Sequence, residues 1–511
     1  MKLLQSVLTV GGYTMASRVT GLVRDLLTAS YLGAGPVADA FFIAFRLPNL
    51  FRRMFAEGAF SAAFVPLFAG VLERDGRSEA RRFAEQAMAV LVTVLLVLTI
   101  AAEITMPLVI RVMAPGFTDE PDKLALAVEF SRITFPYLLC TAVMALMAGV
   151  LNGLGRFAAA AAAPIVLNLF MLAALLLLVE PTGSAGHALS WGVAAAGVGQ
   201  VLLLVLACRR NGMSLRPVLP RLTPCVRRLM RLMGPGMVGA GVMQINLLVG
   251  TMIASLLPTG AVSWLYYADR LYQLPLGVIG IAAGTVLLPE MSRRIAAGDE
   301  AGAYAAQNRT VGLTLALAAP FFVAFLVMPD LIMSALFQRG AFDAEAARRA
   351  GAVLAAYGLG LPAAVLIRSA VSSFYARSDT TTPLIASLSA VGVNIVVKLA
   401  LMDTYGVVGL ALGTAIGVWV NLILLFVLAY RRGWTAPNRT LGKTTLVVAL
   451  ASVLLAAFAW FAPAPVAGWT ASLPLWHNEI TLGILGAAGA LIYGIVLLGG
   501  MKATGIRLAR R

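Results

Sequence analysis

Nine basic side chains stand inside long apolar stretches of this chain, where a charge is costly. Each costs about 2.5–3.5 kcal/mol at the centre of a membrane helix. Arginine in such a place binds phosphate oxygens through two parallel hydrogen bonds and keeps its charge in a poor solvent. An anionic substrate is the chemistry that would justify them. The nine are Arg18, Arg24, Arg46, Arg52, Arg53, Arg132, Arg270, Arg368 and Lys398.

Six of the nine cations belong to three apolar segments, near 5–32, 38–70 and 261–289. Four acidic residues lie in or beside the same segments, so the group has two more positive than negative charges and neutralises itself only in part. A diphosphate would match several arginine side chains in such a group. The acidic residues are Asp25, Asp39, Glu57 and Asp269, and the cations are Arg18, Arg24, Arg46, Arg52, Arg53 and Arg270.

One face of the second apolar segment carries several of these charges. Positions 39, 46, 53 and 57 are separated by seven, seven and four residues, which places them on one side of a helix. Arg53 can pair with Glu57 there, so we predict Arg46 and Arg53 to be structural or cavity-lining cations. Arg52 and Asn49 point to an adjacent face.

The other cations of this group differ in how readily they find a partner. Arg18 stands seven positions before Asp25, a spacing that lets two side chains share a helix face. Arg24, Arg52 and Arg270 have the fewest evident partners, and we assign them to a ligand. The alternative for all these cations is a structural ion pair, or a long side chain that extends to the membrane surface.

Composition places the chain in a bilayer. Of its 511 residues, 60% are hydrophobic and 12% are charged, and the mean hydropathy is +0.89. Such values exclude an ordinary water-soluble globule. Apolar segments long enough to cross a bilayer as helices recur throughout, so we predict an all-α polytopic membrane protein with fourteen transmembrane helices. The predicted spans lie near 5–32, 38–70, 84–110, 124–152, 160–179, 187–208, 229–257, 261–289, 310–337, 350–375, 382–402, 406–430, 442–464 and 480–501.

Basic residues are unevenly distributed between the ends of these spans. With the N-terminus inside, 25 of the 39 Lys and Arg residues flank the cytoplasmic ends and 5 flank the opposite ends. Because cytoplasmic loops are enriched in Lys and Arg, we predict that both termini are cytoplasmic and that the chain lies in the inner membrane. Three cysteines and two distant histidines indicate neither a disulfide framework nor a metal site.

The chain contains an internal repeat. AFRLPNL at 44–50 matches ADRLYQL at 268–274, which aligns Arg46 with Arg270, and LVLACRR at 204–210 matches FVLAYRR at 426–432. The repeat predicts an N-terminal lobe of six helices at 1–210 and a C-terminal lobe of six at 211–432, related by a pseudo-two-fold axis. Two further helices at 433–511 lie outside it.

Several of these segments resemble a known family. The chain is similar over its whole length to the MurJ (MviN) family of lipid II flippases, within the multidrug/oligosaccharidyl-lipid/polysaccharide exporter superfamily. The motifs that carry the resemblance are RVTGLVRD (18–25), DAFFIAFRLPNLFRRMFAEGAFSAAFVP (39–66), APGF (114–117), YYADRLYQLPLGVIGIAAGTVLLPE (266–290) and FQRGAF (337–342).

The resemblance implies a transporter and not an enzyme. It implies two lobes around a V-shaped cavity that moves lipid II, which is undecaprenyl-diphosphate-MurNAc-pentapeptide-GlcNAc, to the outer leaflet. The last two helices would form a groove for the lipid tail, and the cell-wall synthesis machinery is a candidate partner. The implied functional arginines are Arg18, Arg24, Arg52 and Arg270, and the same motifs contribute Asp25, Asp39, Asn49, Glu57 and Asp269 to the predicted substrate-binding set.

The sequence departs from the sodium site that some members of this family have. The predicted seventh helix has no carboxylate between Leu229 and Leu257, and Lys398 stands one turn after Asn394 in the eleventh. An ammonium group there would repel sodium, so we predict no cofactor and no metal. Coupling to the membrane potential or to protons stays open.

Three other functions fit parts of the sequence. A flippase for another undecaprenyl-diphosphate-linked oligosaccharide would use the same cations. A cation-coupled multidrug exporter would need a mainly acidic cavity, which the net positive charge argues against. A membrane glycosyltransferase could use the carboxylates of DEPD at 119–122, but this short run is more typical of a solvated loop.

Overall fold

The computed structural model of the 511-residue chain describes residues 2–53, 60–470 and 476–506. These residues form helices and no strands, which confirms the prediction of an all-α protein. The helices pack into two compact units. Unit 1 comprises Met1–Ser263 with Gly340–Phe342, and unit 2 comprises Trp264–Arg339 with Asp343–Arg511.

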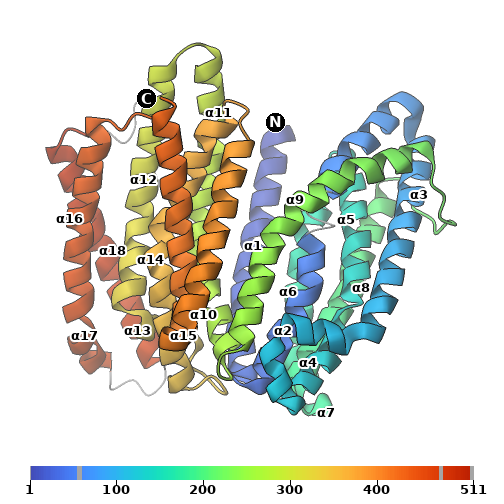
Figure 1. The fold of residues 1–511 in the computed structure, drawn as a ribbon, viewed down its shortest axis with the longest axis horizontal. Helices are drawn as coiled ribbons and strands as arrows, with labels where there is room; N and C mark the ends of the chain where they lie inside the picture. The colour runs from blue at the N-terminus through green and yellow to red at the C-terminus, as the bar shows by residue number, and fades with distance from the viewer. Residues whose placement is uncertain (1, 54–59, 471–475, 507–511) are drawn as a thin grey trace. The chain divides into compact units, whose positions relative to one another are not determined.

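Unit 1 contains long helices that run side by side, coloured blue to green in Figure 1. Helix α6 packs against α1 and α8, and α3 packs against α5 and α9. The helices are α1 (Lys2–Leu32), α2 (Pro36–Arg52), α3 (Phe60–Met113), the 3-10 helix η2 (Pro115–Asp119), α4 (Pro121–Thr134), α5 (Tyr137–Gly153), α6 (Ala158–Leu177), α7 (Val179–Thr182), α8 (Ala185–Arg210) and α9 (Pro224–Ser255).

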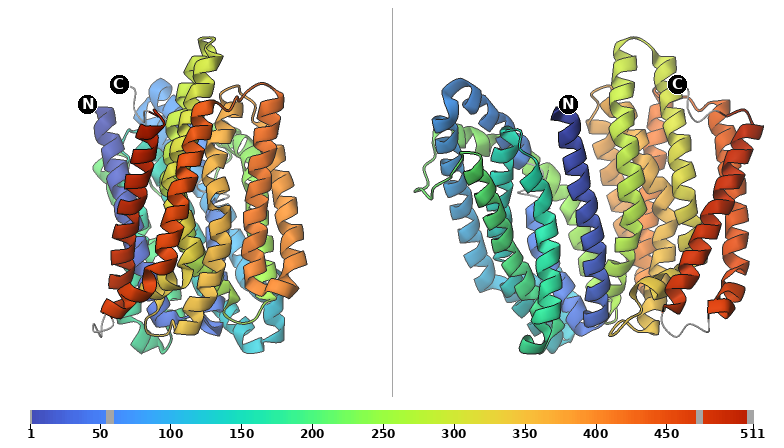
Figure 2. Two further views of the ribbon diagram at one scale, coloured as in Figure 1. Left: turned by 90° about the vertical axis from the view of Figure 1, so that its left-hand side faces the viewer. Right: turned by 180° about the vertical axis from the view of Figure 1, so that it is seen from behind.

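Unit 2 is built in the same way, from helices coloured yellow to red in Figure 2. Helix α14 packs against α12 and α15, and α16 packs against α12 and α18. The helices are α10 (Ala261–Pro275), whose first three residues belong to unit 1, the π-helical turn η3 (Leu276–Gly280), α11 (Ile281–Ala296), α12 (Glu300–Val327), α13 (Pro329–Phe337), α14 (Ala344–Tyr375), α15 (Thr381–Arg431), α16 (Arg439–Phe461), α17 (Pro463–Thr470) and α18 (His477–Ala503).

The boundaries of several helices differ from the predicted spans. Ten helices of the described chain are long and apolar enough to cross a membrane, judged by length and composition, so fourteen spans remain a prediction. The predicted span 38–70 covers α2, which ends at Arg52, and the first part of α3, which is described from Phe60 onward; residues 54–59 lie outside the described residues. The span 261–289 is interrupted by the π-helical turn after Pro275, where the proline nitrogen has no hydrogen to donate.

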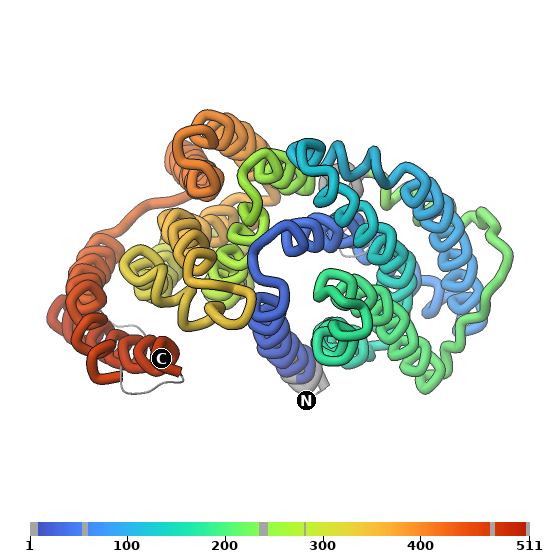
Figure 3. The backbone as a smooth tube through the Cα atoms, turned by 90° about the horizontal axis from the view of Figure 1, so that it is seen from below, coloured from blue at the N-terminus to red at the C-terminus, as the bar shows by residue number. Residues whose placement is uncertain are grey.

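Two of the long helices each contain a glycine with non-helical backbone angles. Gly76 in α3 has φ 82°, and Gly406 in α15 has φ 54°. Only glycine adopts positive φ without steric cost, so each marks the point where two helices meet. The break at Gly406 divides α15 into two halves, which correspond to the predicted spans 382–402 and 406–430. The two halves run side by side in Figure 3.

Polar residues set the first turns of many helices. The side chain of each accepts a hydrogen bond from a backbone N–H that has no partner within the helix. Helix α2 begins instead with Gly35 followed by Pro36, whose fixed φ suits the first turn. The capping residues are Ser184 of α8, Thr223 of α9, Asp299 of α12, Asp343 of α14 and Asn438 of α16.

The helices of the two halves recur at a nearly constant spacing. Pro36 and Ala261, which begin α2 and α10, are 225 positions apart. Arg210 and Arg431, the last residues of α8 and α15, are 221 apart. This spacing agrees with the offset of the sequence repeat.

Candidate functional site

Arg24 is held by several partners within unit 1. It is buried in α1, and its Nε and Nη2 lie 3.1 and 2.7 Å from Oδ1 of Asp25. Its Nη1 donates to Oδ1 of Asn168 on α6 over 2.8 Å. The prediction that Arg24 is among the cations with the fewest partners is therefore wrong, because its long side chain reaches the carboxylate of the next residue.

Arg18 and Arg52 lie on other parts of the same unit. Arg18 is half-buried in α1, one and a half turns before Arg24. Arg52 is half-buried at the end of α2, and its Nε lies 3.2 Å from Oδ1 of Asn49. The Nδ2 of Asn49 donates to the backbone oxygen of Phe45 over 2.7 Å, which fixes the orientation of the amide. Asn49 thus positions Arg52 from one turn away.

The two cations predicted to be structural occupy different environments. Arg46 is half-buried in α2 and donates a hydrogen bond to the hydroxyl of Thr251 on α9. Arg53 is exposed just beyond the last residue of α2. Glu57, its predicted partner, lies outside the residues that the structure describes. A structural or cavity-lining role for Arg46 and Arg53 stays a prediction.

Asp39 is completely buried in α2 and is bound by unit 1 itself. Its Oδ2 accepts from the backbone N–H of Gly260 over 2.7 Å. Its Oδ1 accepts from both the backbone N–H and the hydroxyl of Ser263, over 2.9 and 2.6 Å. Lys123 lies 3.5 Å from the same carboxylate. These contacts make Asp39 the cap of the segment that begins α10.

Lys123 completes this buried cluster. Its ammonium donates to the hydroxyl of Thr259 over 2.9 Å, lies 3.2 Å from Glu120 and faces the ring of Phe117 at 4.3 Å. Lys123 precedes the predicted span 124–152 and is expected in a loop, whereas its side chain is only 3% exposed. Because a buried charge needs a partner, the lysine belongs with Asp39. Glu120, part of the DEPD run, is exposed and contacts both Lys123 and Thr259.

Arg270 of unit 2 is the residue that the sequence repeat aligns with Arg46. It is half-buried in α10, where its Nη2 donates to the hydroxyl of Tyr266 over 2.8 Å and its guanidinium lies 4.5 Å from the centre of the same ring. Asp269 accepts a hydrogen bond from Gln273. Arg270 stands about one turn before Pro275 and the π-helical turn, a kind of irregularity that is common at functional sites.

The remaining predicted intramembrane cations are dispersed. Arg132 on α4 and Arg368 on α14 are exposed, whereas Lys398 in the first half of α15 is 8% exposed. Gly413, in the second half of α15, lies against the Lys398 side chain so closely that an added Cβ would stand 2.7 Å from its Cγ. The lysine is thus packed into the contact between the two halves of this helix.

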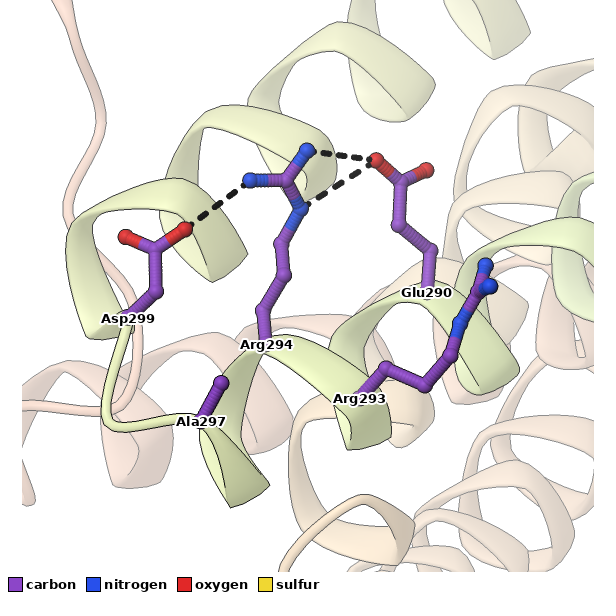
Figure 4. A pocket seen from close by; sticks show the side chains of 5 residues that line it. All are labelled: Glu290, Arg293, Arg294, Ala297 and Asp299. Atoms are coloured by element: carbon purple, nitrogen blue, oxygen red, sulfur yellow. Dashed lines mark hydrogen bonds and ion pairs between the residues drawn. The ribbon is translucent and has the colours of Figure 1, made fainter.

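Unit 2 also has a cavity of about 320 Å³ at the end of α11, shown in Figure 4. Its central cation, Arg294, lies 3.1 Å from Glu290 and 3.0 Å from Asp299. Arg309 also pairs with Glu290, at 3.2 Å. Because Arg294 bridges two carboxylates and Arg309 pairs with one of them, an ion-pair network surrounds this cavity.

Asn168 and Ser263 are residues that the sequence analysis missed. Asn168 is the single side chain in 158–177 that can donate or accept a strong hydrogen bond, so a polar residue in an apolar run was the available signal. Besides holding Arg24, its Nδ2 donates to the backbone oxygen of Ser17 and the hydroxyl of Thr20, over 3.0 and 3.1 Å. Ser263 has no comparable signal, because its partner is 224 positions away.

Known proteins with similar sequences are lipid II flippases. A family model described as "Lipid II flippase MurJ" matches residues 28–476. A probable lipid II flippase MurJ of Rhizobium meliloti is 45% identical over 99% of this chain and 96% of that protein. The lipid II flippase MurJ of Burkholderia cenocepacia is 36% identical over 86% of each chain.

Solved structures support the same fold. A lipid II flippase MurJ in an inward closed conformation matches with a TM-score of 0.78 at 24% identity, covering 97% of this chain and 99% of that one. An inward-facing multidrug transporter of the MATE family matches with a TM-score of 0.63 at 14% identity, covering 83% and 98%. The family model and the sequence relatives together confirm the predicted resemblance: this chain belongs to the lipid II flippase MurJ family.

Proposed function

We propose that this chain is a flippase for lipid II, which it moves from the cytoplasmic to the periplasmic leaflet of the inner membrane by alternating access. The observation that carries this proposal is membership of the family over 99% of the chain. Arginines in apolar helices of both units agree with a diphosphate substrate. No bond is made or broken, so the protein acts as a transporter and not as an enzyme.

Four arginines are the proposed ligands of the diphosphate: Arg18, Arg24 and Arg52 of unit 1 and Arg270 of unit 2. Arg24 has five N–H donors, four of which point to Asp25, Asn168 and the sulfur of Met171. A phosphate that binds there would replace some of these partners, and such an exchange suits a protein that must also release its substrate. Asp39 is not among the proposed ligands, because its oxygens are bound within unit 1.

The last helices are proposed to receive the undecaprenyl tail. Helices α16 and α18 pack on α12 through an apolar cluster that includes Val323, Leu455 and Tyr493. Their outer faces expose large apolar side chains, among them Leu450 and Leu491. The proposed domain boundaries remain 1–210, 211–432 and 433–511, with both termini cytoplasmic. The enzymes that use lipid II on the periplasmic side are the proposed partner class.

A transport assay with purified protein tests this function. Liposomes that contain the protein should move labelled lipid II between leaflets, and Arg52→Ala and Arg270→Ala should each abolish transport and fail to support growth in depleted cells. Arg82→Ala is the matched control, since that side chain is 75% exposed. Full activity of both test variants would show that Arg52 and Arg270 do not bind the substrate. Equal transport of other undecaprenyl-diphosphate-linked sugars would show that the protein does not distinguish between head groups.

A further inference from the structure

Arg132 is an intramembrane cation that the proposed transport site does not use. It lines a cavity of about 590 Å³ between α4 and α8 in unit 1. Glu129, His187 and Trp191 line the same cavity, together with apolar residues that include Val128. The cavity therefore brings an acid, a base and an interfacial aromatic residue together on one side of the unit.

The polar groups of this cavity retain capacity for a ligand. Nε2 of His187 lies 3.0 Å from Oε1 of Glu129, whose side chain is 57% exposed. Nδ1 of His187 is buried without a hydrogen-bond partner among the described residues. Buried polar atoms are normally hydrogen-bonded, and this nitrogen lacks the usual partner within the part of the chain that the structure describes.

The surroundings of the cavity indicate where that partner comes from. Helix α3 packs against α4 and exposes Ile104 and Leu108, by 73% and 62%, and Trp191 of the cavity lining on α8 is 52% exposed. In a membrane protein such a surface contacts lipid, and tryptophan is enriched where the hydrocarbon meets the head groups. The cavity thus extends along α4 to its last turn, faces the first turns of α8 and lies beside a surface suited to lipid.

We propose that this cavity binds the head group of a phospholipid that carries both a phosphate and a primary ammonium group. Arg132 would bind the phosphate oxygens through its planar guanidinium, and Glu129 would accept hydrogen bonds from the ammonium. A purely anionic head group would meet the carboxylate of Glu129, and a quaternary ammonium has no N–H to donate to it. The acyl chains would lie along the exposed apolar side chains of α3 and α8.

Competition between lipids tests this proposal independently of the transported substrate. The full-length protein is placed in nanodiscs with equal amounts of phosphatidylethanolamine, phosphatidylcholine and phosphatidylglycerol of identical acyl chains, and retained lipid is measured by native mass spectrometry. We expect phosphatidylethanolamine to be retained about tenfold over the other two, a factor within reach of one charge-assisted hydrogen bond. Equal retention of all three lipids, or a preference for phosphatidylglycerol, would overturn the proposal.

Variants assign the preference to residues. Glu129→Gln keeps the side-chain shape and should abolish the preference for phosphatidylethanolamine over phosphatidylglycerol, whereas Arg132→Ala should lower retention of every phospholipid. Glu180→Gln and Arg111→Ala are the controls, because both residues are exposed and neither lines the cavity. Unchanged lipid retention in either test variant, with the same thermal unfolding midpoint as the parent, would contradict the assignment.

Discussion

Arg24 and Asn168 join helices α1 and α6 by a buried hydrogen bond of 2.8 Å between residues 144 positions apart. The amide of Asn168 is held in turn by the backbone of Ser17 and the hydroxyl of Thr20. Its oxygen therefore faces Arg24 in a fixed orientation. A cation proposed to bind a diphosphate is thus positioned by the carboxylate of Asp25 and by the neutral amide of Asn168.

The first prediction concerns this positioning. Asn168→Ala should lower lipid II transport by about tenfold or more, because it leaves a buried guanidinium without one of its acceptors. The cost in stability should be about 1–3 kcal/mol, measured by thermal unfolding of the purified protein. Asn211→Ala, at the end of α8, is the control, since its amide bonds only within its own helix. Wild-type transport by Asn168→Ala would exclude a positioning role.

A second prediction concerns the buried pair of Asp39 and Lys123. Asp39→Ala should destabilise unit 1 by about 3–5 kcal/mol, because it leaves the Lys123 ammonium with one exposed carboxylate and removes the acceptors of Gly260 and Ser263. Lys123→Met in the same protein should recover part of that loss.

A double-mutant cycle on unfolding free energies measures the coupling, for which we expect about 1–3 kcal/mol. The exposed pair of Arg82 and Glu79 is the reference and should show less than about 1 kcal/mol. Additive effects of the Asp39 and Lys123 substitutions would show that the two side chains do not interact.

The third prediction uses the glycine of the APGF motif. A Cβ on Gly116 would stand 2.0 Å from the backbone oxygen of Ser255, so Gly116→Ala must displace η2 from α9. We expect a loss of about 1–3 kcal/mol in unfolding free energy, the usual range for overpacking. Gly35→Ala is the matched control, because nothing lies within 4 Å of its Cβ position. Equal stability of the two variants would argue against this close contact.

The fourth prediction concerns pH and the carboxylate of Asp379, between α14 and α15. Hydrogen bonds from the backbone N–H and hydroxyl of Thr382, and the pairing with Arg432 at 2.6 Å, lower the pKa of Asp379 to about 2 from its ordinary 3.8. A lowered pKa in the folded state contributes stability that is complete above the ordinary value. That contribution is lost as the pH falls through 3.8 toward 2.

Asp379→Asn keeps an acceptor for Thr382 but loses the charge. Its thermal unfolding midpoint should therefore lie below that of the parent at pH 7, and the difference should shrink between about pH 4 and pH 2. Asp75→Asn, an exposed aspartate in α3, provides the control. A difference that stays constant from pH 7 to pH 2 would disprove the contribution of the Asp379 charge.

The sequence was informative about contacts within one helix and less so about contacts between helices. Spacing correctly related Arg52 to Asn49, which are three positions apart. It did not predict that Arg24 bonds to its immediate neighbour Asp25, because adjacent residues point about 100° apart on a helix and only a long side chain bridges that angle. Nor did it predict the burial of Lys123, since periodicity does not tell which helix covers a given face.

Composition and hydropathy by themselves determined that this is an all-helical membrane protein with cations in its apolar segments. The motifs determined the family to which it belongs. These properties follow from local chemistry, because backbone groups in a bilayer must be satisfied within helices. Only the tertiary structure decided that Arg24 has Asn168 as a partner and that Asp39 caps the segment at Ser263, 224 positions away. Such pairs depend on which helices pack together, and helical periodicity relates residues only a few positions apart.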